Sequence, residues 1–429
     1  MLVEKSSMER EDKYDPNSLQ DLLPVFYKRL FPCGLFYKWL NYGEVRGTNF
    51  KFREFSFTLA EDIYLRHLSF TDKDEMEKEI LRLCPHKIDI GPVLNVRAKD
   101  HKIATLKPVH RELVLDIDLT DYDGIRTCCQ GGDVCTKCWK FMVVAIKVLD
   151  RALREDFGFQ HLLWVFSGRR GVHCWICDGV ARMLNSQGRS AIVDYLSIFP
   201  SKKPYLTSKT LYHSYIRRSY NICLPYFETV CLEEQDIFSG EKGLEKLLYM
   251  IDEPAFLEEV KQHLNRAGSS ANSTTRWGIV SAAVSQKKNK GGGKRGGIYD
   301  ALFEEEMVLR YLMPRLDEHV TTGMGHLLKA PFCIHPKTGR LAMPINPKAV
   351  DKFDPNKSPP TITQLLREID EFDARSMEIS SSADGQLKVR DARKTSMHKS
   401  LVIFEEFLRG LENERKEDRL AANDMKMEF

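Results

Sequence analysis

One short segment constrains the fold of this chain more than any other. Residues 112–119 read ELVLDIDL, so apolar side chains recur at every second position from Leu113. Side chains of a strand alternate between its two faces, which places Asp116 and Asp118 together on the face opposite the leucines. We therefore predict a β-strand whose apolar face packs on a core and whose other face carries two neighbouring carboxylates.

The segments around this strand predict a mixed α/β (α+β) fold. Apolar residues at helical spacing indicate helices, and alternation indicates strands. Gly158 follows a predicted helix at 136–157, and glycine commonly terminates helices. The elements predicted for the first half are a helical segment at 15–39, a strand at 53–59, a helix at 136–157, and strands at 162–167 and 172–177 around a tight turn at 168–171.

The second half is less regular. Residues 200–264 indicate helices, and strand-like and turn-like sequence returns over 304–347. Between them, residues 267–297 contain GSSANSTT and KKNKGGGKRGG, a composition that predicts a flexible basic loop. Within it Lys294 is followed by arginine rather than by Ser or Thr, which argues against a phosphate-binding P-loop. Residues 361–429 predict two helices, the second of which docks on a partner or extends into solvent.

The two carboxylates suggest a divalent-cation site. Asp116 and Asp118 repel each other when both are ionised, unless a cation neutralises them. Mg²⁺ and Mn²⁺ prefer such oxygen ligands, and a pair of these ions can drive phosphoryl transfer. A solvated strand edge would show the same two residues, so the motif alone leaves both interpretations open.

A cysteine cluster follows this strand. Cys128, Cys129, Cys135 and Cys138 match the ligand type of a tetrahedral structural zinc site, although four unrelated buried cysteines remain an alternative. Pairing the last two with the second Cys-x-x-Cys, at Cys174, would give a zinc-ribbon-like spacing. That pairing is disfavoured, because the cysteines of this second motif lie on a strand and point to opposite faces.

A basic turn comes next along the chain. Residues 167–173 read SGRRGVH and join a hydroxyl, two guanidiniums and an imidazole around glycines that let phosphate approach the backbone. A triphosphate fits this chemistry, and a hairpin with solvated arginines fits it equally well. Further cations follow in GHLLK at 325–329 and HPKTGR at 335–340, whereas Asp317 is unremarkable by itself.

Composition sets limits on function. The chain has 429 residues, of which 42% are hydrophobic and 29% charged, as in ordinary globular proteins. The formal net charge of +3 means that any surface for a polyanion must be local. The charged N-terminus and the short apolar runs predict neither a signal peptide nor a membrane span. Eleven cysteines without a secretion signal favour a reducing compartment.

Together these stretches resemble one family, the small catalytic subunit of the eukaryotic-type primase in the archaeo-eukaryotic primase superfamily. SGRRGVH with a downstream HPKTGR is the most specific combination. The matching stretches run in the family's order from about residue 20 to 355, and they are REFSFTL, HKIDIG, LVLDIDLTDYD, CC-x5-C-x2-C, DFGF, LWVFSGRRGVHCWICD, PRLD, GHLLKAPF and HPKTGR.

The resemblance implies a role for each matching residue. Asp116, Asp118 and Asp317 resemble the carboxylates that hold two catalytic Mg²⁺ or Mn²⁺ ions, and the four clustered cysteines resemble a structural zinc site. Asp89 and His335 resemble residues near the sugar. The residues that resemble the rest of the nucleotide pocket are Arg53, Lys87, Ser167, Arg169, Arg170, His173, His326 and Lys329.

The resemblance also implies a division into units. A primase-type catalytic domain takes 15–200 and 298–360, with its zinc motif at 128–138. A small helical subdomain that includes the basic loop takes 201–297, and a helical tail, in part disordered, takes 361–429.

The family implies synthesis of short RNA primers on single-stranded DNA from ribonucleoside triphosphates, in the nucleus. It also implies a large partner subunit with an iron–sulfur cluster, the DNA polymerase alpha complex beyond it, and no membrane. Three rivals remain open: a superfamily polymerase that uses deoxynucleotides, a non-catalytic zinc-stabilised nucleic-acid-binding module, and a phosphohydrolase that uses the same carboxylates.

Overall fold

Two antiparallel sheets form the centre of the molecule. The computed structural model describes residues 14–42, 48–197, 213–251, 253–290, 302–379 and 389–427. Sheet A has the order β2-β1-β3-β4, with β8 also paired to β3, and sheet B has the order β5-β7-β6. The strands are β1 (Arg53–Thr58), β2 (Tyr64–Leu68), β3 (Lys87–Leu94), β4 (Pro108–His110), β5 (Leu113–Asp118), β6 (Leu162–Phe166), β7 (Gly171–Ile176) and β8 (Leu328–Lys329).

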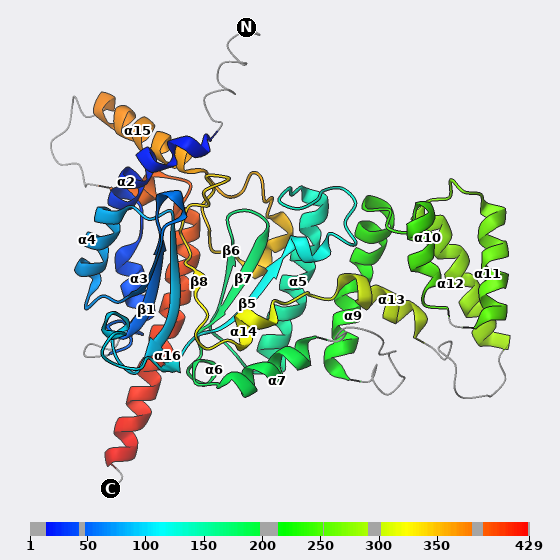
Figure 1. Cartoon of the computed structure of the whole chain (residues 1–429), viewed down its shortest axis with the longest axis horizontal. Coiled ribbons are helices and arrows are strands. Elements are labelled where there is room, and N and C mark those ends of the chain that lie inside the picture. Colours follow the sequence, from blue (N-terminus) through cyan, green and yellow to red (C-terminus); the bar gives the residue numbers. More distant parts are fainter. Residues whose placement is uncertain are drawn as a thin grey trace.

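Helices surround these sheets and extend beyond them at one end (Figure 1). The α-helices are α2 (Leu19–Arg29), α3 (Cys33–Leu40), α4 (Lys73–Leu83), α5 (Thr136–Glu155), α6 (Gly179–Arg182), α7 (Ser186–Leu196), α9 (Ser214–Tyr226), α10 (Gly240–Leu248), α11 (Pro254–Ala267), α12 (Ser273–Lys290), α13 (Phe303–Leu312), α14 (Glu318–Thr322), α15 (Ile362–Ile379) and α16 (His398–Met427). The shorter helical segments are η1 (Pro16–Ser18), η2 (Ala60–Asp62), η3 (Ala98–Asp100), η4 (Leu119–Tyr122), the π-helical η5 (Phe227–Glu234), η6 (Pro347–Lys352) and η8 (Asp391–Lys394).

The predicted mixed α/β fold is confirmed, and its central strands follow the sequence pattern. β5 pairs with β7 so that Asp116 lies opposite His173 and Asp118 lies opposite Gly171. The apolar residues Leu113, Leu115 and Ile117 are completely buried, as the alternation predicts. Trp139 on α5 packs edge-on against Phe166 of β6, so this long amphipathic helix covers sheet B.

The first predicted helical segment divides into two helices. α2 ends at Arg29, and α3 begins after Pro32, which has no N–H to donate to a preceding turn. Trp39 of α3 packs edge-on against Trp175 of β7 and Phe404 of α16. This aromatic cluster joins the N-terminal helices, sheet B and the C-terminal helix into one core.

The prediction of a flexible loop over 267–297 is wrong for residues 273–290, which form α12. The polar stretch before it is a helix start, since the Asn272 side chain accepts a hydrogen bond from the Thr275 amide at 2.9 Å. Trp277 packs against Phe227 of η5, and Val280 is completely buried. The lysine- and glycine-rich residues 291–297 lie outside the described residues.

The prediction of strand-like sequence from residue 304 is also wrong at its start. Residues 303–312 form α13, whose first turn carries three glutamates that suit the positive end of the helix dipole. Only Leu328 and Lys329 form a strand in this region, and they pair with β3.

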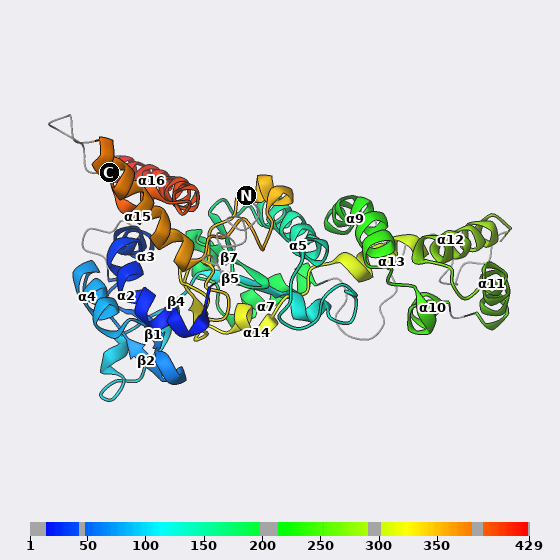
Figure 2. The same ribbon diagram turned by 90° about the horizontal axis from the view of Figure 1, so that it is seen from above.

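The two predicted C-terminal helices are confirmed as α15 and α16. The apolar stripe of α16 packs on this chain, where Phe404 is completely buried and Leu408 nearly so. Figures 1 and 2 place α16 at one end of an elongated molecule and α10, α11 and α12 at the other. The proposed domain boundaries stay a prediction.

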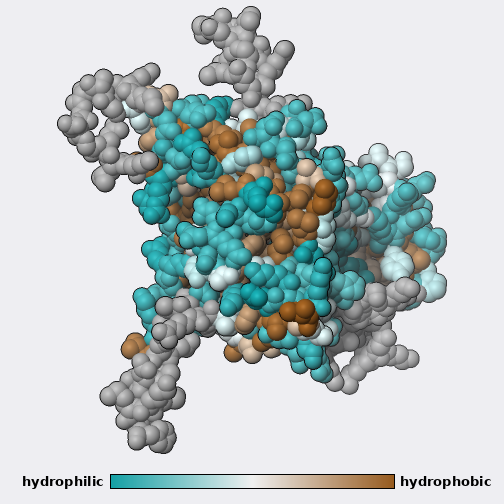
Figure 3. Space-filling model, turned by 60° about the vertical axis from the view of Figure 1, so that its left-hand side comes forward, coloured by the Kyte–Doolittle hydropathy of each residue, from teal (hydrophilic) through white to brown (hydrophobic). Residues whose placement is uncertain are grey.

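The face of the molecule drawn in Figure 3 is mainly hydrophilic, with several hydrophobic patches among the polar residues. Within the described part of the chain, none of the helices combines the length and the apolar character that crossing a membrane requires.

Candidate functional site

The two strand carboxylates lie at the end of β5. The Asp116 carboxylate lies 3.5 Å from Nε2 of His173 on β7. Asp118 accepts hydrogen bonds from both the amide and the hydroxyl of Thr120, each at 2.8 Å. Nε of Arg170 donates to the other Asp118 oxygen at 2.8 Å. The Thr120 role was missed from the sequence, although a hydroxyl two residues after an Asp that ends a strand is a usable signal.

Asp317 joins this pair from far along the chain. Its backbone amide donates a hydrogen bond to the Asp116 carbonyl at 3.0 Å. One of its carboxylate oxygens caps α14 by accepting from the amides of His319 and Val320, at 2.9 and 3.2 Å. The structure therefore brings the three aspartates of the predicted site together, from two segments widely separated in sequence.

The carboxylates differ in their electrostatics. Burial, together with the charges of Asp118 and Asp317, raises the pKa of Asp116 to about 7. Burial acts in the same direction on Asp118, but hydrogen bonds from Thr120 and Arg170 outweigh it and lower the pKa of that group. A buried carboxylate that its neighbours repel is one that a cation would stabilise. The donor set fits hard divalent ions such as Mg²⁺ or Mn²⁺.

The basic turn lies beside the carboxylates. Gly168 has a φ of +94°, and a Cβ there would come within 2.7 Å of the His335 Cβ, so the turn requires glycine. The Ser167 hydroxyl accepts a hydrogen bond from the Gly171 amide at 3.0 Å and holds the turn closed. Arg169 projects from this turn toward the cysteine loop, where Gly132 leaves room for its guanidinium.

Two lysines face the turn from sheet A. Lys329 of β8 donates a hydrogen bond to the Ser167 carbonyl, which links the two sheets. Burial, with a contribution from the charge of Lys87, lowers the pKa of Lys329 to about 8. Lys87 lies 3.3 Å from the Asp89 carboxylate, and Asp89 also accepts from the Ser56 hydroxyl at 3.1 Å.

A cavity of about 300 Å³ lies between these groups. It brings together most of the predicted nucleotide-binding residues and two of the three aspartates. Four basic residues and two acidic ones lie in its wall, so it suits an anion bound beside a cation site. The lining residues are Lys87, Asp116, Asp118, Ser167, Arg169, Arg170, His173, His326, Leu327, Leu328, Lys329 and His335.

The histidines of the cavity are neutral near pH 7. Burial and the charge of Lys329 lower the pKa of His173 and that of His335 to about 3. Burial, together with the charge of Arg111, also lowers the pKa of His326. A neutral imidazole can donate one hydrogen bond and accept another, which suits a sugar hydroxyl better than a phosphate.

Arg53 does not reach the cavity, which corrects its predicted place in the nucleotide pocket. Its side chain is completely buried and pairs with Glu112 through two hydrogen bonds, at 2.7 and 2.9 Å. It also donates to the Gly91 carbonyl at 3.0 Å, and Tyr42 donates to the same glutamate. This fork fixes β1 to the start of β5, so Arg53 has a structural role. Asp89 lies beside Lys87 and outside the cavity wall.

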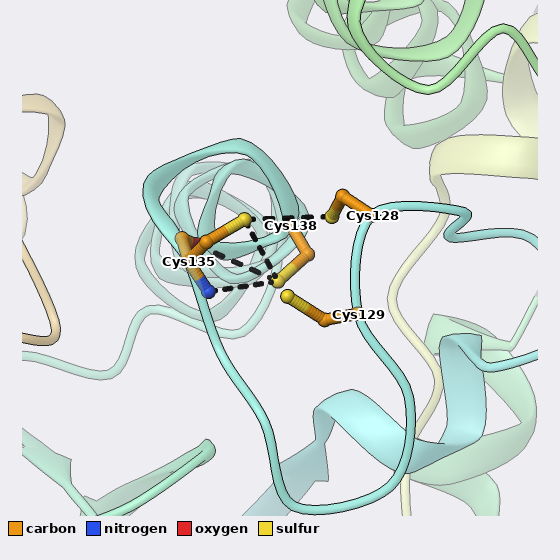
Figure 4. A group of neighbouring side chains, drawn as sticks. All are labelled: Cys128, Cys129, Cys135 and Cys138. Carbon is orange, nitrogen blue, oxygen red and sulfur yellow. Dashed lines mark hydrogen bonds between the residues drawn. The ribbon is translucent and has the colours of Figure 1, made fainter.

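The four clustered cysteines point toward one another at the N-terminus of α5 (Figure 4). Their sulfur atoms all lie within 4.8 Å of each other. Cys135 Sγ lies 3.5 Å from Cys128 Sγ and 3.9 Å from Cys138 Sγ. Tetrahedral zinc at its usual bond length to sulfur separates its ligands by about 3.8 Å, so the cluster fits a structural zinc ion.

Donors from outside the cluster support the sulfurs. Gln235 Nε2 donates to Cys128 Sγ at 3.2 Å, and Gln235 Oε1 accepts from the Thr127 amide at 2.7 Å. Arg126 Nη1 lies 3.8 Å from Cys138 Sγ. Such donors stabilise thiolate ligands. Gln235 was not predicted, because only the tertiary fold brings it to the cluster.

The second Cys-x-x-Cys motif stays apart from this cluster. Cys174 and Cys177 are both buried, and Cys177 accepts a hydrogen bond from the Trp39 indole at 3.4 Å. Their burial in the aromatic core explains them without a metal.

The aspartates beside a cavity lined by basic side chains, and the cluster of four cysteines, suit an enzyme that binds a phosphate-containing substrate beside divalent cations. The family model for the DNA primase small subunit matches residues 115–347, more than half of the chain. The DNA primase small subunit of Drosophila melanogaster is 46% identical over 413 residues, which are 94% of this chain and 94% of that protein. The one from Schizosaccharomyces pombe is 39% identical over 80% of this chain and 77% of its own, and the one from Saccharomyces cerevisiae is 37% identical over 79% and 83%.

The chain belongs to the DNA primase small subunit family. It is a catalytic subunit of the nucleotidyltransferase class that acts in DNA replication by making primers, as the sequence predicted.

Proposed function

We propose that the chain joins ribonucleotides into short RNA primers on single-stranded DNA by two-metal-ion nucleotidyl transfer. One observation carries this proposal: Asp116 and Asp118 line a single cavity together with Arg169, Arg170 and Lys329. The acidic side suits metal ions and the basic side suits a triphosphate, so both partners of a metal–nucleotide complex find ligands in one place.

Asp116, Asp118 and Asp317 would hold two Mg²⁺ or Mn²⁺ ions. Such ions lower the pKa of an attacking 3′-hydroxyl and offset the charge of the departing pyrophosphate. The chain's own part is positioning and electrostatics. Arg169, Arg170 and Lys329 bind the triphosphate oxygens, and the neutral His173, Nε2 of which lies 3.5 Å from Asp116, keeps that carboxylate oriented.

Release of Asp118 from Arg170 is part of this scheme. The Arg170 guanidinium pairs with the Asp118 carboxylate at 2.8 Å. A bound triphosphate offers the guanidinium a more highly charged partner, which leaves Asp118 available to a cation. His335, which lies on the cavity wall, is the proposed contact to the sugar, and Lys87 on the same wall belongs to the phosphate-binding pocket, with the buried Asp89 beside it.

We further propose that the chain assembles with a large subunit that carries an iron–sulfur cluster, and through it with the DNA polymerase alpha complex in the nucleus. The relatives are small subunits by name, which supports the first of these partners.

The deciding experiment is primer synthesis on unprimed single-stranded DNA with Mn²⁺ or Mg²⁺, with and without a candidate large subunit. Ribonucleotide incorporation is the expected result, and Asp116→Asn should abolish it. Preferred incorporation of deoxynucleotides would favour a repair polymerase instead. Release of phosphate without template or product would favour a phosphohydrolase, and no metal-dependent polymerisation at all would favour a binding module.

A further inference from the structure

The helix that carries Asp317 at its start is fixed along β5 by three successive contacts. The Asp317 amide bonds to the Asp116 carbonyl at 3.0 Å. The Thr321 hydroxyl donates to the Val114 carbonyl at 2.8 Å. The Arg111 guanidinium donates to the carbonyls at 320 and 323, both at 2.9 Å. Figure 1 shows α14 beside β5, in agreement with these bonds.

Arg111 lies where a charge is costly to bury. Its side chain has no solvent exposure, and among the described residues no carboxylate forms an ion pair with it. Its Nε and Nη2 also lack hydrogen-bond partners within that part of the chain. Burial of a guanidinium without a counter-ion and with two unpaired nitrogens costs free energy. What the side chain gains is the negative end of α14, where carbonyl oxygens have no partner within the helix.

A second buried arginine holds the backbone at this position. Arg189 of α7 donates to the carbonyl of Arg111 at 2.5 Å and to that of Glu112 at 3.0 Å. It also donates to the Leu184 carbonyl at 2.9 Å. The start of β5 is therefore fixed from the side of α7, which makes Arg111 a rigid support for the end of α14.

We propose that Thr321 and Arg111 are positioning residues that hold Asp317 in register with Asp116, so that the three carboxylates present one ligand set to divalent cations. The inference rests on the proposed metal-binding role of Asp317. Asp317 stands at the start of α14, a helix of five residues that is too short to be stable by itself, and on its other side the Arg315 amide bonds to the Tyr122 hydroxyl at 3.1 Å. Its place must come from these tertiary contacts.

Thr321→Val tests the proposal, because valine keeps the shape of threonine and removes the hydroxyl. Thr322→Val is a matched control, since within the described part of the chain the Thr322 hydroxyl bonds only inside α14, to the Glu318 carbonyl at 2.8 Å. Thr321→Ser restores the hydroxyl. The readouts are hydrogen exchange of the backbone amides at 317–321, Mn²⁺ binding measured by electron paramagnetic resonance, and primer synthesis as a function of Mn²⁺ and of nucleotide.

Thr321→Val should speed exchange of the Asp317 amide and weaken Mn²⁺ binding by about three- to ten-fold, the usual effect of one lost hydrogen bond. The KM for nucleotide at saturating Mn²⁺ should stay unchanged, because the phosphate-binding side of the cavity is intact. Thr322→Val and Thr321→Ser should behave like the wild type. Arg111→Met, a second variant, should speed exchange over the same amides.

Equal exchange and equal Mn²⁺ affinity in Thr321→Val and Thr322→Val would overturn the proposal. Asp317→Asn separates this failure from that of the proposed function. If Asp317→Asn binds Mn²⁺ and makes primers normally, the metal-binding role of Asp317 is wrong. If Asp317→Asn loses Mn²⁺ binding and Thr321→Val does not, only the positioning role is wrong.

Discussion

Gly132 of the cysteine loop lies directly against the guanidinium of Arg169. A Cβ at residue 132 would come within 1.7 Å of Arg169 Nη2 and within 2.4 Å of Cζ. The loop that gathers the thiolates therefore also borders the nucleotide pocket. Its shape restricts where a phosphate-binding arginine can lie.

Gly132→Ala should displace Arg169 and raise the KM for nucleotide by about tenfold, the worth of one charge-assisted hydrogen bond. The free energy of unfolding should change little, because the displaced atoms are the far end of the flexible Arg169 side chain. Gly124→Ala is the control, since a Cβ at 124 would have no atom of the described residues within 4 Å. In an Arg169→Ala background the same substitution should have no further effect on KM. An additive effect there would mean that Gly132 acts on something other than Arg169.

Asp116→Asn should lower primer synthesis on the order of a thousand-fold, because stabilisation by bound metal is worth several kcal/mol. The same change should leave the fold intact and raise stability by about 1 kcal/mol at pH 8 without added Mg²⁺ or Mn²⁺. The reason is that Asp116 is buried beside Asp118 and Asp317, which raises its pKa to about 7. Thermal unfolding and a primer assay measure the two effects. Loss of activity with loss of folding would leave the catalytic assignment without support.

The raised pKa of Asp116 also predicts a pH dependence of metal use. Its pKa is 3.8 without perturbation and about 7 in the fold, so the folded protein holds an extra proton between these values. Stability without divalent ions should therefore fall as pH rises from about 4 to 7. As the pH rises toward 7, the Mn²⁺ concentration for half-maximal activity should fall by up to about tenfold per pH unit, because proton and cation compete for one carboxylate. Above pH 7 this concentration should stay constant. A flat profile from pH 6 to 8 would contradict this.

Local patterns in the sequence predicted the parts of the site that lie close together along the chain. The alternation of residues 112–119 gave the strand and the shared face of its aspartates. The spacing of Cys128, Cys129, Cys135 and Cys138 gave the sulfur cluster, because short loops force such residues together. Composition misled at residues 273–290, where serine, asparagine and threonine mark a helix start rather than a loop.

Contacts between distant segments could not be read from local patterns. Asp317 was assigned by resemblance to a family, since nothing near it in sequence points to Asp116. Gln235, Thr321 and Arg111 were missed, because their roles depend on which carbonyl or sulfur the fold brings to them. Arg53 was misassigned for the same reason, since the local sequence of a strand does not show whether its arginine binds a phosphate or a buried glutamate.

Arg53→Met should destabilise the protein by about 3–5 kcal/mol, because it leaves the completely buried Glu112 without its counter-ion. The charge of Arg53 and hydrogen bonds from Arg53 and Tyr42 outweigh burial and lower the pKa of Glu112 to about 2. Without Arg53, Glu112 would either keep an unpaired buried charge or take up a proton, and both cost free energy. The double variant Arg53→Met with Glu112→Gln should recover much of the loss. Chemical denaturation measures both. A raised KM for nucleotide in a fully stable Arg53→Met protein would return Arg53 to the nucleotide pocket.

Cys129→Ser should remove zinc and lower stability by more than about 3 kcal/mol, since a structural metal contributes directly to folding. The loss should spread to η5, because Gln235 bonds to both Cys128 Sγ and the Thr127 amide and so attaches the cluster to that segment. Zinc content by elemental analysis and hydrogen exchange at 227–235 are the measurements. Cys84→Ser is the control, since among the residues that the structure describes that thiol donates only to the nearby Leu81 carbonyl, at 3.3 Å. Retention of one zinc ion per chain in Cys129→Ser would mean that the other three sulfurs suffice and that the fourth ligand lies elsewhere.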